Sequence, residues 1–257
     1  MPLIMAHRGA RNLWAENSLL GFRKTLEAGF DAVEFDVHLS KAGELLVIHD
    51  ATLARTTSQS GLVADLTPQS RRDLQLKNEY GSLIDEGVPS LEEVLDIFEA
   101  YPNARLYVEL KSDINGHPYE GIVAKVADLL RARGMQNRAC LHSFDINVVR
   151  KVAEIAPEFE RLISVNQDWA DRQGGLAQFL RDVDGLVDIV GIHHALFDAE
   201  FDYIRDHFGL ERCSSWTLND PDLIRKWIER GPKWLVSDNP ILLRDLLNTP
   251  MQGNENV

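Results

Sequence analysis

The chain has 257 residues, of which 44% are hydrophobic, 26% charged and 8% aromatic. This composition is typical of a globular protein and excludes a disordered, fibrous or disulfide-rich one. With 27 basic and 40 acidic residues the net charge is −13 at pH 7. Nucleic-acid binding requires a basic surface, so we expect no nucleic-acid partner. The length is compatible with one α/β barrel or with two modest domains.

The cysteines and the N-terminus favour a cytoplasmic location. Cys140 and Cys213 each lie in an apolar run, and we expect both to be buried, inert thiols. No basic leader precedes a long apolar segment, and no run approaches the roughly 18 apolar residues of a membrane span. We therefore expect a cytoplasmic protein without stable membrane insertion, and the sequence allows a homo-oligomer.

Short apolar runs alternate with amphipathic segments, as in parallel βαβ units. We predict nine strands, over residues 3–7, 32–37, 45–49, 105–110, 139–143, 161–165, 189–193, 212–216 and 234–237. We predict helices over residues 17–28, 90–100, 119–133, 145–155, 220–230 and 240–247.

One step in this series lacks a helix. Residues 38–44 are too few for a helical crossover and contain Gly43, so they predict a hairpin. A turn about Ala42 and Gly43 would place Asp36 opposite His49. Without the hairpin strand, eight strands remain, the number in a (β/α)₈ TIM barrel. We therefore predict a single barrel domain over residues 1–248; a doubly wound sheet is less favoured because the sequence has no GxGxxG or GxxxxGK[ST] loop.

Two segments fall outside this alternation. Residues 51–88 predict a small insertion after the hairpin, with a short basic helix that begins at Thr67-Pro68. Residues 249–257 predict a flexible tail.

Carboxylates gather at predicted strand ends, where the active sites of barrels lie. Glu34 and Asp36 share one face of a strand, and Glu109 and Lys111 repeat the same spacing. Three converging carboxylates repel one another unless a cation lies between them. Oxygen ligands favour Mg²⁺ or Ca²⁺ over zinc. The alternative is that these acids form structural ion pairs with Arg or Lys.

His7 ends the first predicted strand, and His49 ends the hairpin strand. His7 and His49 have the pKa range for acid and base catalysis, although a lone histidine is more often structural. Arg8 and Lys111 could bind a phosphate or serve as buried ion-pair partners. Together these groups are those expected for metal-assisted cleavage of a phosphodiester.

The order of these motifs resembles that of bacterial glycerophosphodiester phosphodiesterases. The matching segments are His7-Arg8-Gly9, Glu16-Asn17-Ser18, Glu34-Phe35-Asp36-Val37, His49-Asp50, Pro89-Ser90-Leu91-Glu92-Glu93-Val94, Glu109-Leu110-Lys111, Ser143-Phe144, Trp216-Thr217-Leu218-Asn219 and Ser237-Asp238-Asn239-Pro240. The resemblance covers residues 4 to about 247. It departs from the family's usual pattern at residues 15–18 and 40–43, outside the metal and histidine positions.

The resemblance implies a TIM barrel with a small insertion that hydrolyses glycerophosphodiesters to sn-glycerol 3-phosphate and an alcohol with Mg²⁺ or Ca²⁺. In related enzymes a glycerol hydroxyl attacks first and water then opens a cyclic phosphate. The sequence does not decide which histidine acts first. The residues carried over are Glu34, Asp36 and Glu109 for the metal, His7 and His49 as general base and acid, Arg8 and Lys111 for the phosphate, and Trp216 for the glycerol pocket.

Two further residues have open roles. Asn17 could cap the first helix or direct its amide into the barrel mouth. His193, in Gly191-Ile192-His193-His194, could contact substrate or be structural. This segment and residues 115–121 lie where loops set specificity.

Other functions compatible with the sequence are a sugar-phosphate diesterase, a lysophospholipase D or sphingomyelinase D type of enzyme, and a catalytically silent phosphodiester-binding barrel. A barrel glycosidase and an amidohydrolase are less favoured. Glu34 and Asp36 do not lie on opposite sides of a sugar, and His7 begins no His-x-His motif.

Overall fold

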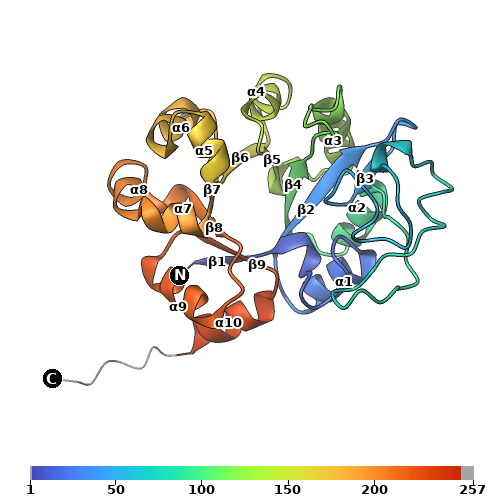
Figure 1. Cartoon of the computed structure of the whole chain (residues 1–257), viewed down its shortest axis with the longest axis horizontal. Helices are drawn as coiled ribbons and strands as arrows, with labels where there is room; N and C mark the ends of the chain where they lie inside the picture. Colours follow the sequence, from blue (N-terminus) through green and yellow to red (C-terminus); the bar gives the residue numbers. More distant parts are fainter. Residues whose placement is uncertain (1, 250–257) are drawn as a thin grey trace.

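The computed structural model describes residues 2–249, in which a ring of strands is surrounded by helices (Figure 1). Eight of the described strands pair in parallel and close in the order β1-β2-β4-β5-β6-β7-β8-β9-β1. The predicted (β/α)₈ barrel is confirmed. The flexible tail predicted over 249–257 lies, except for its first residue, outside the described residues.

The strand positions agree with the sequence prediction to within two residues at each end. The strands are β1 (Leu3–Ala6), β2 (Ala32–Leu39), β3 (Leu45–Val47), β4 (Arg105–Leu110), β5 (Ala139–Ser143), β6 (Glu160–Val165), β7 (Ile189–His193), β8 (Cys213–Trp216) and β9 (Trp234–Ser237).

All six predicted helices are present. The helices are α1 (Leu19–Glu27), α2 (Leu91–Glu99), α3 (Ile122–Ala132), α4 (Ile146–Ile155), α5 (Gln167–Arg172), α6 (Leu176–Val183), α7 (His194–Ala199), α8 (Phe201–His207), α9 (Pro221–Arg230) and α10 (Pro240–Asn248). The short helices α5 to α8, which follow β6 and β7, were not predicted. Within residues 2–249, no helix is both long enough and apolar enough to span a membrane.

The hairpin forms as predicted, but its predicted register is wrong by one residue. β3 pairs antiparallel with β2, and Val37 lies opposite Val47. Asp36 therefore lies opposite Ile48, whose N–H donates to the Asp36 carbonyl at 3.1 Å. The tight turn has Gly43 at φ 87°, a conformation that glycine adopts without strain.

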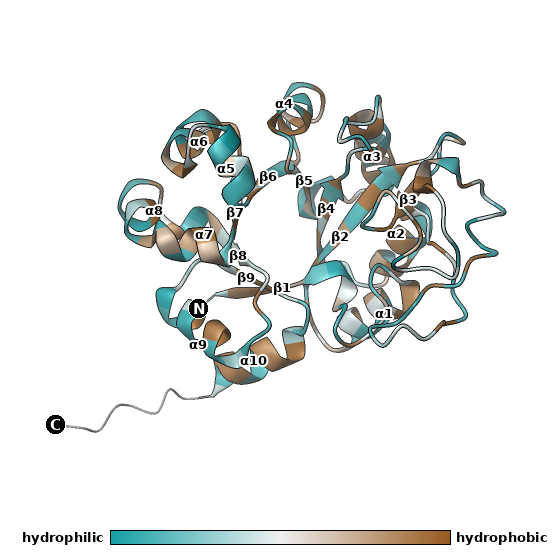
Figure 2. Cartoon of the chain, viewed as in Figure 1, coloured by the Kyte–Doolittle hydropathy of each residue, from teal (hydrophilic) through white to brown (hydrophobic). Residues whose placement is uncertain are grey.

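Side chains alternate between the helix layer and the barrel interior. On β2, Val33, Phe35 and Val37 pack against the surrounding helices, so Glu34 and Asp36 point inward. The apolar faces of the helices turn toward the strands (Figure 2). The floor of the barrel is filled by Met5, Tyr107, Cys140, Leu162, Ile189, Trp234 and Val236. The polar residues therefore lie above this floor, at the carboxyl ends of the strands.

The segment 51–88 forms loops and a 3₁₀ turn, η2 (Val63–Asp65), beside β3. The basic helix predicted from Thr67-Pro68 is wrong, because residues 68–72 form turns only. A small apolar core of its own includes Leu53, Leu74 and Val88. The limits of the predicted insertion and of the single domain stay a prediction.

A buried arginine fixes this segment to the barrel. Arg71 is only 3% exposed. Its guanidinium donates to the Val88 carbonyl at 3.0 Å, to Glu93 at 2.8 Å and to Glu44 at 3.2 Å. Because Glu93 belongs to α2 and Glu44 precedes β3, one side chain joins three segments.

We expect Arg71→Ala to lower the free energy of unfolding by roughly 2 kcal/mol or more, because it leaves two carboxylates and a carbonyl without their partner. Urea unfolding measures this loss. Arg72→Ala is the matched control, because its side chain is exposed, and its effect should stay within about 0.5 kcal/mol. Equal effects of the two substitutions would contradict this role for Arg71.

Candidate active site

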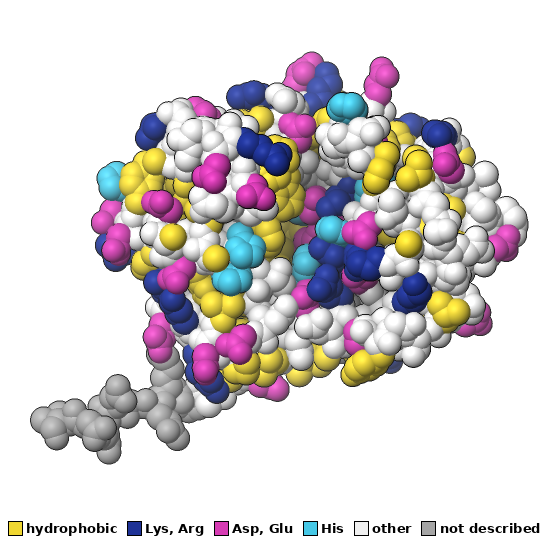
Figure 3. Space-filling model, in the orientation of Figure 1, with side chains coloured by type: hydrophobic (Ala, Val, Ile, Leu, Met, Phe, Trp, Pro, Cys, Tyr) yellow, Lys and Arg dark blue, Asp and Glu magenta, His cyan; other side chains and the backbone are white. Residues whose placement is uncertain are grey.

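A cavity of about 320 Å³ opens at the carboxyl ends of the barrel strands. The space-filling view shows histidine, basic and acidic side chains gathered around a central hollow (Figure 3). The charged and imidazole groups that line the cavity are His7, Arg8, Arg11, Glu34, His49, Glu109, His142 and Asp238. Predicted site residues on or directly after β1, β2, β3, β4 and β8 therefore meet in one place.

The chain turns sharply after β1. Arg8 and Ala10 have φ values of 50° and 66°, in the left-handed region that non-glycine residues rarely adopt. This turn directs the Arg8 backbone N–H to Glu34 Oε2 at 3.1 Å. Such strain persists when the surrounding contacts hold it, and it is common at functional sites.

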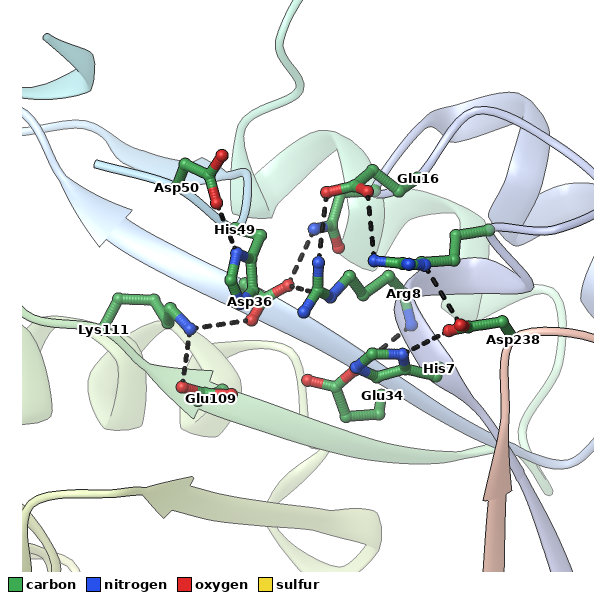
Figure 4. Close-up of polar contacts among 12 residues, drawn as sticks. His7, Arg8, Glu16, Glu34, Asp36, His49, Asp50, Glu109, Lys111 and Asp238 are labelled. Carbon is green, nitrogen blue, oxygen red and sulfur yellow. Dashed lines mark hydrogen bonds and ion pairs between the residues drawn. The ribbon is translucent and has the colours of Figure 1, made fainter. Parts of the chain in front are cut away.

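His7 is oriented by a carboxylate from the last strand. Its Nδ1 lies 2.5 Å from Asp238 Oδ1, and its Nε2 lies 3.8 Å from Glu34 Oε2 (Figure 4). Asn219 and Arg11 hold the second oxygen of Asp238, at 2.7 and 3.1 Å. Burial alone would raise the pKa of Asp238, but the hydrogen bond and charge of His7 keep it below its ordinary value. The role of Asp238 was not predicted from the sequence.

His49 has a corresponding partner. Its Nδ1 lies 2.6 Å from Asp50 Oδ1, and Arg55 donates to both oxygens of Asp50. Arg55 also contacts both oxygens of Glu16, at 2.7 and 2.8 Å. The hydrogen bond from His49 is the largest cause that holds the pKa of Asp50 far below its ordinary value. Asp50 is thus ionised and fixes the His49 ring.

His38 contacts the backbone of His49. Its Nε2 lies 3.0 Å from the His49 carbonyl oxygen, and its Nδ1 lies 2.9 Å from the Tyr119 hydroxyl. Burial lowers the pKa of His38 to about 4, so the ring is neutral at pH 7. His38 therefore donates to His49 and accepts from Tyr119.

Asp36 is fully buried and is surrounded by donors. Asn17 donates to Oδ2 at 2.8 Å, Lys111 lies 3.4 Å from Oδ1, and Arg8 lies 3.5 Å from Oδ2. Burial alone would raise the pKa of Asp36, but the charge of Lys111, with those of His49 and Arg8, holds it well below its ordinary value.

The Asn17 amide thus faces Asp36, and Asn17 itself lines neither cavity beside that residue. Its predicted role at the mouth stays a prediction. Its other predicted role, as the cap of the first helix, is wrong. Ser18 caps α1 by accepting the Gly21 N–H at 2.9 Å.

Lys111 and Glu109 form a buried pair on β4 and its following loop. Lys111 Nζ donates to Glu109 Oε1 at 2.8 Å. Burial opposes the charge on each group, yet their attraction raises the pKa of Lys111 and lowers the pKa of Glu109. Both groups are charged at pH 7, and Glu109 is available as an anionic ligand.

Glu34, Glu109 and His142 could hold a cation. One ligand atom of each lies within 4.8 Å of the others, and all three residues are buried. Glu34 Oε1 and both ring nitrogens of His142 have no hydrogen-bond partner among the described residues. Buried polar atoms without partners are costly, and a divalent cation would satisfy the Glu34 oxygen and one of the two His142 nitrogens. The residues therefore fit such an ion.

His142 was not predicted as a site residue. It lies opposite Glu109 in the ladder between β4 and β5, on the inward face with Cys140. The alternation of β5 could have identified it. Conversely, Asp36, a predicted metal ligand, lies outside this group of three and faces Lys111, Arg8 and Asn17.

Aromatic rings form another part of the cavity wall. The rings of Trp216 and Phe144 meet edge to face with centroids 5.6 Å apart, and both line the cavity. His193 lies outside the lining; its ring contacts Trp216 at 5.0 Å, and its Nδ1 accepts the Ala195 N–H at 3.3 Å to cap α7. His193 therefore contacts a residue of the cavity wall without lining the cavity.

Comparison with known proteins identifies the family. Residues 7–242 match the model of the glycerophosphoryl diester phosphodiesterase family. The chain belongs to this family. This confirms the family and the enzyme class that the sequence motifs predict.

Individual relatives agree with this family. A glycerophosphodiester phosphodiesterase of Bacillus altitudinis is 34% identical over 164 residues, which cover 62% of this chain and 65% of that protein.

Solved structures of relatives share the whole fold. A putative glycerophosphoryl diester phosphodiesterase of Agrobacterium tumefaciens is 25% identical with a TM-score of 0.86, over 96% of this chain and 97% of the other. An Oleispira antarctica phosphodiesterase, solved with the product sn-glycerol-3-phosphate, is 25% identical with a TM-score of 0.79, over 97% and 98%.

We expect Glu34→Gln and Glu109→Gln each to weaken the binding of Mg²⁺ or Ca²⁺ by at least about tenfold, because each removes an anionic ligand. Calorimetry with the metal alone measures this. The same measurement on Asp36→Asn and His142→Gln decides which of these two residues is a ligand. Unchanged affinity in both glutamate variants would contradict the cation site.

Proposed function

We propose that this protein hydrolyses glycerophosphodiesters to sn-glycerol 3-phosphate and an alcohol, with a divalent cation and two histidines. The main support for this proposal is that His7 and His49, each hydrogen-bonded to a carboxylate, line the same cavity as Glu34 and Glu109. The product complex of the Oleispira antarctica relative supports the proposed chemistry.

The two histidines would transfer protons. The Nδ1 of each ring is engaged by an aspartate, Asp238 or Asp50. This arrangement leaves Nε2 of each ring to accept or donate a proton, as in other aspartate–histidine pairs. One ring would take the proton of the attacking hydroxyl, and the other would protonate the leaving alcohol.

The basic residues would bind the phosphate. Arg8 lines the cavity beside Glu34, and Lys111 lies on the side of His49. Both are held by buried carboxylates, so their charges are in place before substrate binds. Such fixed charges stabilise the negative charge that develops on phosphate oxygens without reorganisation.

Glu34, Asp36 and Glu109 are the proposed metal ligands, with His142 as an alternative to Asp36. A bound Mg²⁺ or Ca²⁺ would polarise the phosphoryl oxygens as a Lewis acid. Lys111 Nζ lies 3.4 Å from Asp36 Oδ1, an oxygen that has no hydrogen-bond partner among the described residues. Asp36 could bind the ion through this oxygen once Lys111 moved away from it.

Three further residues have supporting roles in this proposal. Trp216 would form one wall for the glycerol carbons, and His193 would hold the Trp216 ring in place. Asn17 would act on the phosphate through Asp36, to which its amide donates. The cytoplasmic location and the homo-oligomer stay predictions of the sequence.

We expect the purified protein, supplied with Mg²⁺ or Ca²⁺, to release sn-glycerol 3-phosphate from at least one member of a panel of glycerophosphodiesters. The panel should vary the leaving alcohol, and an enzyme-coupled assay for sn-glycerol 3-phosphate measures turnover. Absence of turnover on the whole panel with metal supplied would refute the proposed function.

We expect His7→Ala and His49→Ala each to lower kcat by roughly 10² or more, since acid and base groups typically contribute that much. Asp238→Asn and Asp50→Asn should lower kcat in the same direction, because they remove the charge that orients each ring. His207→Ala is the control, because this histidine is exposed at the end of α8. A near-normal kcat in either alanine variant at His7 or His49 would exclude that residue from the mechanism.

A further inference from the structure

Two cavities meet at the candidate active site. The first is the cavity already described, with Trp216 in its wall. The second, here called the rim cavity, has a volume of about 410 Å³ and lies between β4, β5 and the loops that follow them. His49, Glu109 and Phe144 line both cavities. The boundary between the cavities is therefore formed by groups of the proposed reaction centre.

A phosphodiester extends two arms from its phosphorus atom. If the phosphate lies at the boundary, beside His49 and Glu109, the two arms must enter different cavities. The glycerol arm is common to all glycerophosphodiesters and suits the cavity that Trp216 and Phe144 enclose. The rim cavity is then the place for the alcohol that leaves, which differs between substrates.

We propose that the rim cavity binds the leaving alcohol and selects alcohols that carry an ammonium group, an inference that rests on the proposed function. The main support is the lining of the rim cavity, which combines the carboxylates of Asp113 and Asp145 with the rings of Phe144 and Trp169.

The carboxylates of the rim cavity are fixed by the backbone. Asp113 accepts the N–H groups of Asn115 and His117 at 2.9 and 2.8 Å, and Asp145 accepts that of Asn147 at 2.8 Å. Backbone hydrogen bonds hold the carboxylates in position without neutralising their charge.

The one basic side chain in this lining is held in ion pairs. Lys111 is the single Lys or Arg among the described residues that line the rim cavity. It is paired with Glu109 at 2.8 Å and Asp36 at 3.4 Å, and in the proposed function its charge faces the phosphate. A cationic alcohol would therefore meet a net negative rim.

The aromatic rings add a second attraction for a cation. The ring centroids of Phe144 and Trp169 lie 6.3 Å apart, and faces of aromatic rings attract ammonium groups. The Arg172 guanidinium lies 5.5 Å from the Trp169 centroid and does not line the cavity. Trp169 thus already accepts a cation in this protein.

A competing cavity has the opposite charge. It has a volume of about 260 Å³, and its lining includes Arg11, Arg55 and Lys77. Among the described residues it shares only Arg11 with the active-site cavity, and His49 does not line it. If His49 is the ring that protonates the leaving alcohol, that alcohol lies beside His49, which lines the rim cavity and not the competing one. We therefore assign the leaving alcohol to the rim cavity.

The experiment compares kcat/KM for glycerophosphodiesters of choline and ethanolamine with that for the neutral glycerol and inositol diesters. We expect a preference of about tenfold for the cationic alcohols, since ion pairing and cation–π contact each contribute a few-fold. The preference should shrink as salt is added, because exposed charges are screened. Equal values for all four diesters would overturn the proposal.

Three variants localise the preference. The double variant Asp113→Asn with Asp145→Asn keeps both hydrogen-bond acceptors. It should lower kcat/KM about fivefold for the choline and ethanolamine diesters and leave the glycerol and inositol diesters unchanged. Trp169→Leu should have a similar effect on the choline diester. Asp128→Asn is the charge-matched control, on the exposed face of α3, and should change no value.

Two further outcomes would contradict the rim cavity. One is that the rim variants change all substrates equally. The other is that a diester whose leaving alcohol carries a carboxylate and no ammonium group is preferred and that Lys77→Gln abolishes this preference.

Choline binding distinguishes this proposal from the proposed function. Saturation-transfer NMR with choline alone needs no turnover. If the protein hydrolyses no diester but binds choline less well in the rim variants, the subsite stands and the hydrolase assignment fails. If choline does not bind to the unaltered protein, the subsite is refuted, whatever the hydrolase activity.

Discussion

The charge balance at the carboxyl ends of β2 and β4 is the constraint on which the candidate site depends. Asp36 and Glu109 are buried, and a buried carboxylate is costly unless it is paired. Lys111 contacts both of them, and Arg8, in the turn after β1, contacts Asp36. The same arrangement leaves oxygen and nitrogen atoms of Glu34 and His142 without partners. The barrel thus holds ionised carboxylates and two fixed cations beside atoms that a divalent ion would satisfy.

Each of the two histidines is oriented by an aspartate that does not belong to the set of Glu34, Asp36 and Glu109. Asp238, at the end of β9, holds His7, and Asp50 holds His49 next to the hairpin strand. Arg55 links Asp50 to Glu16, so a residue of the segment 51–88 holds two acids at the mouth of the proposed active site. This contact gives the segment a direct connection to the proposed chemistry, in addition to its attachment through Arg71.

The fold could be predicted from local patterns because each strand is an apolar run and most helices carry a capping residue, such as Ser90 or Asp220. Long-range geometry was harder to predict. A shift of the hairpin turn by one residue placed Ile48 rather than His49 opposite Asp36. Asp238 orients His7 across 231 positions of the chain, which no local spacing reveals. His142 resembles an ordinary residue of an apolar strand until its pairing with Glu109 is known.

The central claim is that a divalent cation and the two histidines act together on a phosphodiester at this mouth. The most direct measurement is phosphorus NMR of a glycerophosphodiester mixed with protein that has been treated with a chelator and dialysed, before and after Mg²⁺ or Ca²⁺ is restored. The account predicts no reaction without the metal, and conversion of the diester signal to that of sn-glycerol 3-phosphate once the metal is added. Conversion at the same rate without metal, or no conversion with either metal, would contradict it.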